Sequence, residues 1–129
     1  MPDSPLPPII ADSAAAAALF VGLVAGGVER AAVLYLDPEW RLLGRSDFLG
    51  GPGRIAPPMR TIITEALQLN AAALVLGHGH PSGMTEPSVA DVDYTRRLAR
   101  VAEAIDLVLA DHLIVVEDRV FSMREAGLL

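Results

Sequence analysis

The stretch AALVLGHGHPSG, residues 72–83, decides the fold of this 129-residue chain. It opens with a continuous apolar run over residues 72–76, which is typical of a strand buried on both faces of a sheet. Two histidines follow, His78 and His80, and the closing Pro-Ser-Gly predicts a turn. The stretch therefore predicts a central strand that leads directly to a pair of imidazole side chains.

The rest of the chain alternates between helical and extended patterns. Asp12 or Ser13 is expected to cap an apolar helix over residues 14–28, which Gly26 and Gly27 end. Helices and strands that alternate around a buried strand predict an α/β domain with helices on both faces of the sheet. The other expected elements are helices over 59–70 and 88–104, strands over 31–36, 41–48, 107–117 and 119–122, and a loop over 49–53.

The predicted organisation is a single domain over residues 11–129 behind a proline-rich, disordered tail over residues 1–10. The tail lacks the basic region of a secretory signal. The apolar residues 14–28 fall short of the roughly 18 residues expected of a membrane span. We therefore expect a cytoplasmic protein that does not enter membranes.

Cysteine content and charge exclude several function classes. The chain has no cysteine, so disulfides, thiolate metal ligands and a cysteine nucleophile are excluded. The net charge of -6 argues against nucleic-acid binding, which needs a basic surface. Arginines in the predicted helix over residues 88–104 lie among acidic residues, a pattern typical of a solvated helix face. Any metal ion would have to be held by His, Asp or Glu.

The two histidines and a nearby carboxylate form a candidate metal site. In an extended segment, residues i and i+2 point the same way, so His78 and His80 can face one point in space. Asp91 follows at the start of the helix expected over residues 88–104. Two nitrogens and one oxygen make the three-ligand set that leaves a catalytic zinc ion its fourth position for water.

A single histidine near a strand end is more often a structural residue than a ligand, but a pair at i and i+2 is less easily explained in that way. Other residues of the candidate site have a structural explanation. Ser88 and Asp91 match the S-x-x-D pattern of a helix start, which accounts for both without a metal. The two explanations are compatible, because a capped helix start holds a carboxylate rigidly, as a ligand requires. Gly79 would permit close backbone approach to a metal or substrate. For His112, structural packing is favoured over ligation.

A metallohydrolase also needs a base that takes a proton from water. Glutamates are the candidates, and spacing alone does not choose among them. They are Glu29, Glu65, Glu86, Glu103 and Glu117.

The motif residues resemble the JAMM signature of the MPN metallopeptidases, and most closely its bacterial RadC branch. Similarity to RadC extends over nearly all of residues 28–129, including the segments 70–76, 95–98, 111–114 and 121–129. The signature reads here His78-x-His80-Pro81-Ser82-Gly83-x-x-x-Pro87-Ser88-x-x-Asp91.

This resemblance implies a three-layer α/β/α sandwich with a mixed sheet, similar to the cytidine-deaminase-like architecture. It implies one Zn²⁺ per chain, bound through His78, His80 and Asp91. Glu29 matches the family's catalytic glutamate, which would act as a general base and then as an acid to the leaving amine. Ser88 matches the family's serine that stabilises the tetrahedral oxyanion.

The function so implied is zinc-dependent hydrolysis of a peptide or isopeptide bond in a peptide or protein substrate. An alternative is a catalytically silent RadC/MPN-like module that serves as an accessory in protein or DNA processing. Nucleic-acid binding is a third hypothesis, and it predicts salt-sensitive affinity for DNA. A homodimer is compatible with the sequence.

Overall fold

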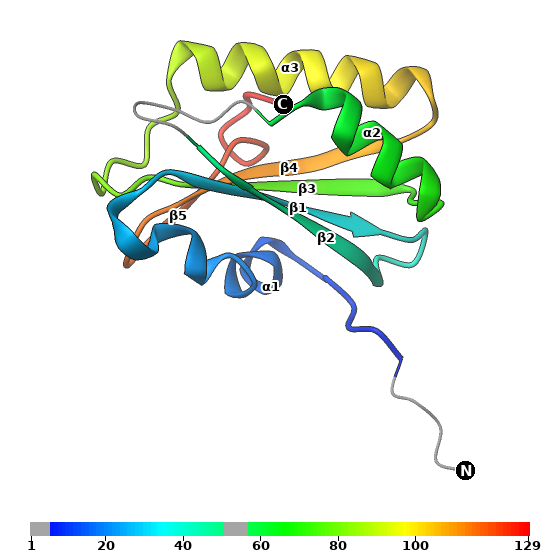
Figure 1. Cartoon of the computed structure of the whole chain (residues 1–129), viewed down its shortest axis with the longest axis horizontal. Helices are drawn as coiled ribbons and strands as arrows, with labels where there is room; N and C mark the ends of the chain where they lie inside the picture. The colour runs from blue at the N-terminus through cyan, green and yellow to red at the C-terminus, as the bar shows by residue number, and fades with distance from the viewer. Residues whose placement is uncertain (1–5, 51–56) are drawn as a thin grey trace.

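The computed structural model describes residues 6–50 and 57–129. They form a sheet in the order β2-β1-β3-β4-β5 (Figure 1). Only β3 and β4 pair in parallel, and the other neighbours are antiparallel, so the sheet is mixed. The strands are β1 (Arg30–Leu36), β2 (Leu42–Leu49), β3 (Ala73–Gly79), β4 (Val108–Val115) and β5 (Val120–Ser122).

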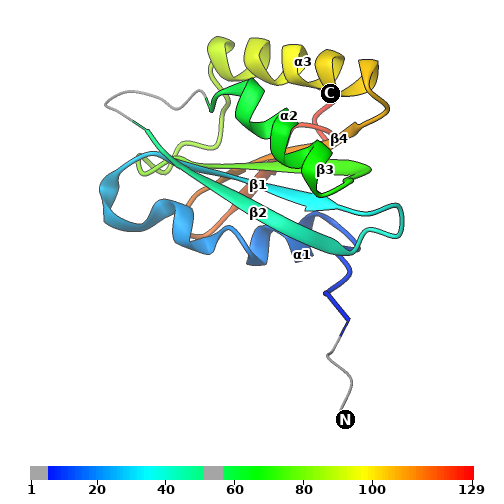
Figure 2. The ribbon, with the colours of Figure 1, turned by 45° about the vertical axis from the view of Figure 1, so that its right-hand side comes forward.

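Helices cover both faces of this sheet, which confirms the three-layer α/β/α fold (Figures 1 and 2). One face carries α2 (Met59–Gln68) and α3 (Val89–Ala104), and the other carries α1 (Ser13–Ala18) and the 3₁₀ segment η1 (Val21–Gly27). β3 is buried along its whole length, as its apolar run predicts.

Alternation along β3 fixes which side chains face which layer. Leu74 and Leu76 belong to the core under α2 and α3, whereas Ala73 and Val75 belong to the core under α1. His78 therefore lies on the α3 side of the sheet, while Gly77 and Gly79 lie on the α1 side. This parity separates the candidate metal ligands from the first helical layer.

The prediction of a single helix over residues 14–28 is wrong. The α-helix ends at Ala18, and η1 follows with a kink in which Ala25 is extended and Gly26 has a φ of 78°. Three glycines in this segment weaken its helical preference. The segment instead packs closely on β3, because Gly77 leaves room for the ring of Phe20. The expected cap is confirmed, since the Asp12 side chain accepts from the Ala15 N–H.

Gly79 permits a close backbone contact, but with η1 and not with a metal or substrate as its sequence position suggested. A Cβ at this position would lie 2.1 Å from the carbonyl oxygen of Leu23 in η1. The close backbone approach is therefore to η1, on the face opposite His78, and not to a metal or substrate. The glycine lets the first layer pack directly on the strand that carries the histidines.

The remaining helix and strand predictions are confirmed within the described residues, with shifts of a few residues at their ends. The predicted loop over residues 49–53 lies largely outside them. Of the tail expected over residues 1–10, residues 1–5 also lie outside, whereas Ile9 pairs with Arg41 and Ile10 is buried. Among the helices described, none has the length and apolar character needed to cross a membrane.

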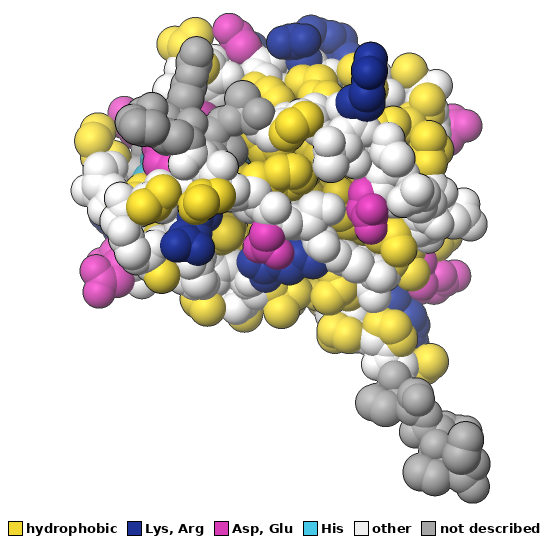
Figure 3. Space-filling view, viewed as in Figure 1, with side chains coloured by type: hydrophobic (Ala, Val, Ile, Leu, Met, Phe, Trp, Pro, Cys, Tyr) yellow, Lys and Arg dark blue, Asp and Glu magenta, His cyan; other side chains and the backbone are white. Residues whose placement is uncertain are grey.

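The arginines of α3 lie on an exposed helix face. Arg96, Arg97 and Arg100 are all exposed. Figure 3 shows basic side chains over α3, and both acidic and basic side chains over the rest of that view. The helix face is solvated, as the charge pattern predicts.

Candidate metal centre

The antiparallel pairing of β1 with β3 brings Glu29 to the histidines. Arg30 pairs with Gly79, so the residue before β1 lies beside the end of β3. Glu29 Oε2 is 3.9 Å from His78 Nε2. Within the part of the chain that the structure describes, both atoms are buried and have no hydrogen-bond partner.

The start of α3 brings Asp91 to the same place from the opposite direction. Ser88 caps the helix, and a full capping box is present: Ser88 Oγ accepts from the Asp91 N–H at 3.0 Å, and Asp91 Oδ2 accepts from the Ser88 N–H at 2.9 Å. The predicted cap is thus confirmed. It fixes a carboxylate that is only 7 % exposed at the mouth of β3.

The carboxylate of Asp91 faces both histidines. Its Oδ1 is 3.6 Å from His78 Nδ1, and its Oδ2 is 3.6 Å from His80 Nε2. The imidazole of His78 therefore stands between two carboxylates, with Nε2 toward Glu29 and Nδ1 toward Asp91. The structure thus brings together all the metal-site residues that the sequence singled out.

These side chains form a cluster that could bind a metal ion. Glu29, His78 and His80 each offer one ligand atom, and these atoms lie within 4.8 Å of one another. Asp91 adds a second carboxylate on the other side of His78. Imidazole nitrogen and carboxylate oxygen suit zinc and several other divalent ions. The buried atoms of Glu29 and His78 that lack a partner among the described residues fit a nearby cation.

The charges of the cluster also suit a cation. Burial alone would raise the pKa of Asp91, but His80 and the Ser88 N–H outweigh it and hold that pKa well below its usual range. Burial lowers the pKa of His78, with the nearby Asp91 opposing the shift. The Asp91 carboxylate raises the pKa of His80. The site therefore offers an ionised carboxylate and a neutral His78, the states in which both groups bind metals.

The hydrogen bonds of His80 select the ring nitrogen that is free to bind. Nδ1 lies 2.8 Å from the carbonyl oxygen of Met84, which can only accept, so Nδ1 carries the proton. In the neutral ring, Nε2 then keeps its lone pair and faces Asp91. A backbone carbonyl that fixes the ring in this way is common for metal-binding histidines.

A surface cavity of about 330 Å³ opens over the cluster. Of the five candidate glutamates, two line this cavity, Glu29 and the exposed Glu86, and Glu29 is the one paired with a histidine. Ser88 lines it as well. Among the described residues, the lining is Glu29, His78, His80, Ser82, Met84, Glu86, Pro87, Ser88 and Asp91.

Beneath the cluster lies a buried pair that the spacing of the sequence could not reveal. Thr95 Oγ1 donates to the Asp91 carbonyl oxygen at 2.7 Å and lies 2.6 Å from His112 Nδ1. The hydroxyl has one proton, which the carbonyl takes, so His112 Nδ1 must donate to Thr95. His112 Nε2 is then an acceptor, and it has no partner among the described residues. His112 supports the helix that carries Asp91, which agrees with the packing role favoured for it.

We expect His112 to make the metal-free fold less stable in acid. Burial, with a contribution from His78, lowers the pKa of His112 to about 3, whereas an unfolded histidine has a pKa of about 6.5. Between these values the unfolded chain binds a proton that the folded chain does not. Stability is therefore lost as the pH falls, by up to about 1.4 kcal/mol per pH unit.

Urea unfolding of native protein and of His112→Asn, both without metal and at pH values between about 4 and 7, measures this contribution. Asparagine keeps an N–H near the Nδ1 position but does not titrate. The variant should show the shallower dependence of unfolding free energy on pH. Equal slopes for the two proteins would mean that His112 takes up its proton equally in the folded and unfolded chains, so that burial does not lower its pKa.

The chain is similar to curated bacterial proteins over most of its length. The family described as RadC-like JAB domain matches residues 10–128. The chain is 41% identical over 103 residues to a UPF0758 protein of Bordetella avium, a match that covers 79% of this chain and 46% of that protein. It is 43% identical over 98 residues to the UPF0758 protein YkfG of Escherichia coli, covering 75% of this chain and 62% of that protein.

A UPF0758 protein of Haemophilus influenzae is 45% identical over 98 residues, covering 75% of this chain and 44% of that protein. The chain thus spans about half the length of the curated relatives it matches. The family match takes in all five strands and every residue of the candidate metal centre. This chain belongs to the RadC-like JAB domain family.

Proposed function

We propose that this chain is a zinc-dependent hydrolase that cleaves amide bonds, with the metal held by His78, His80 and Asp91. One observation carries the proposal: two carboxylates, Glu29 and Asp91, contact opposite ring nitrogens of His78. One carboxylate can then complete the ligand set while the other remains free to move a proton. Asp91 suits the ligand role because its capping box holds it in place.

A zinc ion held there would supply a water whose pKa is lowered to about 7, together with a positive charge that polarises a carbonyl. Glu29 would accept the proton of that water and return it to the leaving amine. Its position supports this role, because its carboxylate lies in the cavity lining beside His78 and remains partly exposed to solvent.

Ser88 would stabilise the oxyanion that forms when the carbonyl is attacked. Its Oγ accepts from the Asp91 N–H through a lone pair, which leaves the hydroxyl proton free to donate. The residue is exposed and lines the cavity. A donor placed in advance at this point lowers the barrier, because no rearrangement is needed as the charge develops.

The cavity over the centre is open and partly polar, so an extended segment of a peptide or protein can lie across it. Cleavage of peptide bonds and of lysine isopeptide bonds would use the same groups. The proposed substrate class is therefore amide bonds in peptides or proteins.

Glu29→Gln tests the proposal most directly. This variant should bind as much zinc as the native chain, because the amide replaces no proposed ligand. Its rate of hydrolysis should fall by about 100-fold or more, because a general base usually contributes that much to the rate. Zinc-loaded protein is assayed on fluorogenic peptides and on peptides joined through a lysine side chain, with zinc content measured on the same samples.

Glu86→Gln is the matched control, since Glu86 lines the same cavity but is exposed and, among the described residues, forms no ion pair with a histidine. It should stay within about twofold of native activity. Native zinc-loaded protein that cleaves neither substrate class would instead favour the catalytically silent module. Full activity in Glu29→Gln would remove Glu29 from the proposed role.

A further inference from the structure

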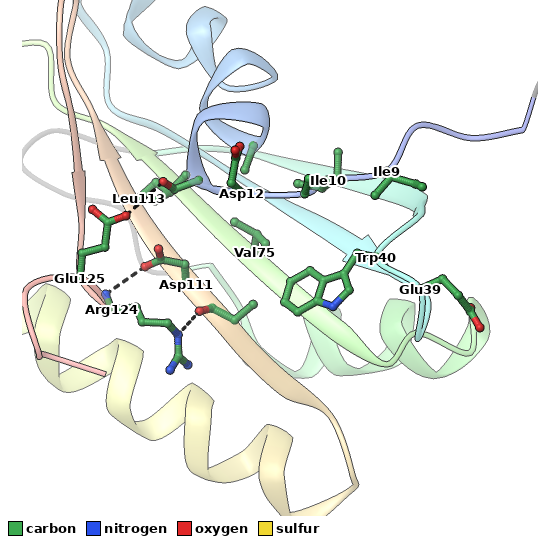
Figure 4. Close-up of a pocket in the computed structure, with 14 residues that line it drawn as sticks. Ile9, Ile10, Asp12, Glu39, Trp40, Val75, Asp111, Leu113, Arg124 and Glu125 are labelled. Carbon is green, nitrogen blue, oxygen red and sulfur yellow. Dashed lines mark hydrogen bonds between the residues drawn. The ribbon is translucent and has the colours of Figure 1, made fainter.

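A second cavity of about 410 Å³ lies on the opposite face of the sheet from the metal centre. Figure 4 shows it between α1, the segment that precedes α1, the turn between β1 and β2, and the C-terminal segment after β5. The cavity exists because α1 is only six residues long and leaves part of this face uncovered. Its volume lies within the usual range of ligand-binding sites.

The floor of this cavity is apolar. Val75 of β3 and Leu113 of β4 form part of it, together with Ile10 and Ala16. Apolar side chains continue onto the rim, where Ile9 is 50% exposed and Trp40 is 43% exposed. The apolar surface therefore extends beyond the cavity itself, which suits a chain segment better than a small molecule.

The rim of the cavity is acidic. Four carboxylates line it, and within residues 6–50 and 57–129 none of them forms an ion pair with an arginine. Arg124 is the one basic residue among the described residues of the lining, and its guanidinium is held against β4 by bonds to the carbonyl oxygens of Ala110 and Leu109. The four acidic residues are Asp12, Glu39, Asp111 and Glu125. Both carboxylate oxygens of Asp111 already accept hydrogen bonds within the chain, so the exposed Asp12, Glu39 and Glu125 are the ones that face a partner.

We propose that this cavity binds a segment of a partner protein that places a large apolar side chain beside a lysine or arginine. The apolar floor would accept the side chain, and the acidic rim would pair with the positive charge. A second copy of this chain is disfavoured, because each copy carries a net charge of -6, so that two copies repel each other.

The cavity and the metal centre lie on opposite faces of the sheet, so such a partner would not compete with a substrate at the metal. Val75 points to the cavity and His78 to the metal centre, as the alternation along β3 requires. Docking at the cavity is thus independent of the proposed hydrolysis and needs no metal.

Trp40 provides the readout, because it is the only tryptophan of the chain. An octapeptide of alternating leucine and arginine, added to the metal-free full chain, should change the Trp40 fluorescence in a saturable way. Octapeptides of leucine with glutamate, or of serine with arginine, should bind at least about tenfold more weakly, because each lacks one of the two features.

Glu39→Gln with Glu125→Gln removes two exposed rim charges and should weaken binding of the leucine–arginine peptide roughly fivefold. Glu103→Gln with Glu117→Gln changes the net charge equally at exposed positions outside the lining, and should leave affinity within about twofold. Three results would overturn the proposal: no saturable response, equal loss in both double variants, or a dimer of the free chain that shields Trp40 from acrylamide.

Discussion

A chain with both His78→Ala and Asp91→Ala is expected to retain no zinc under conditions in which the native chain holds about one ion. Two of the three proposed ligands are lost. Changing a residue that only hydrogen-bonds to a ligand typically lowers metal affinity about 10- to 100-fold, and losing a ligand itself should lower it further. The affinity should therefore fall by far more than about 100-fold. Metal content after dialysis, with competition titration against a chelator, measures it.

Asp93→Ala provides the matched control, because Asp93 is an exposed acid on the same helix, two residues beyond Asp91. It should keep native zinc content. Circular dichroism of the double variant must show a folded chain, since Asp91 also completes the capping box at the start of α3. Undisturbed zinc in a folded double variant would contradict the ligand assignment.

Gly79→Ala is expected to destabilise the fold by about 3 kcal/mol or more, the upper end of overpacking costs. The added Cβ would lie 2.1 Å from the Leu23 carbonyl oxygen, and a backbone atom cannot turn aside as a flexible side chain can. Either η1 or β3 must therefore shift. Urea unfolding of the metal-free protein gives the change in free energy.

Gly22→Ala is the control for this substitution. It lies in the same 3₁₀ segment, and a Cβ there would meet nothing within 4 Å. It should change the free energy of unfolding by less than about 1 kcal/mol. If the two substitutions cost the same, the close packing of η1 on β3 is not what requires a glycine at position 79.

Local sequence patterns were sufficient to predict most residues of the candidate site. The apolar run before His78 predicts the buried strand, and alternation along it explains why His78 and His80 can face the same ion. The S-x-x-D pattern at Ser88 predicts the capping box that holds Asp91. Each of these predictions depends on residues within a few positions of one another, where periodicity and capping chemistry are informative.

Contacts between distant segments could not be predicted in the same way. Spacing did not choose Glu29 among five glutamates, because the register of β1 against β3 decides which one reaches His78. The bond between Thr95 and His112 joins α3 to β4 and leaves no local pattern. The break between α1 and η1 depends on the room that Gly77 and Gly79 leave on a strand nearly sixty residues later.

In the proposed site, Asp91 binds the metal while Glu29 remains free to carry a proton. Glu29, His78 and His80 also form a three-group cluster, so the competing assignment makes Glu29 a ligand. Anomalous X-ray diffraction from crystals of the zinc-loaded chain separates the two. We predict a zinc peak bonded to His78, His80 and Asp91, with the Glu29 carboxylate outside bonding distance. A peak bonded to Glu29 in place of Asp91 would make Glu29 the ligand and leave Asp91 without its proposed role.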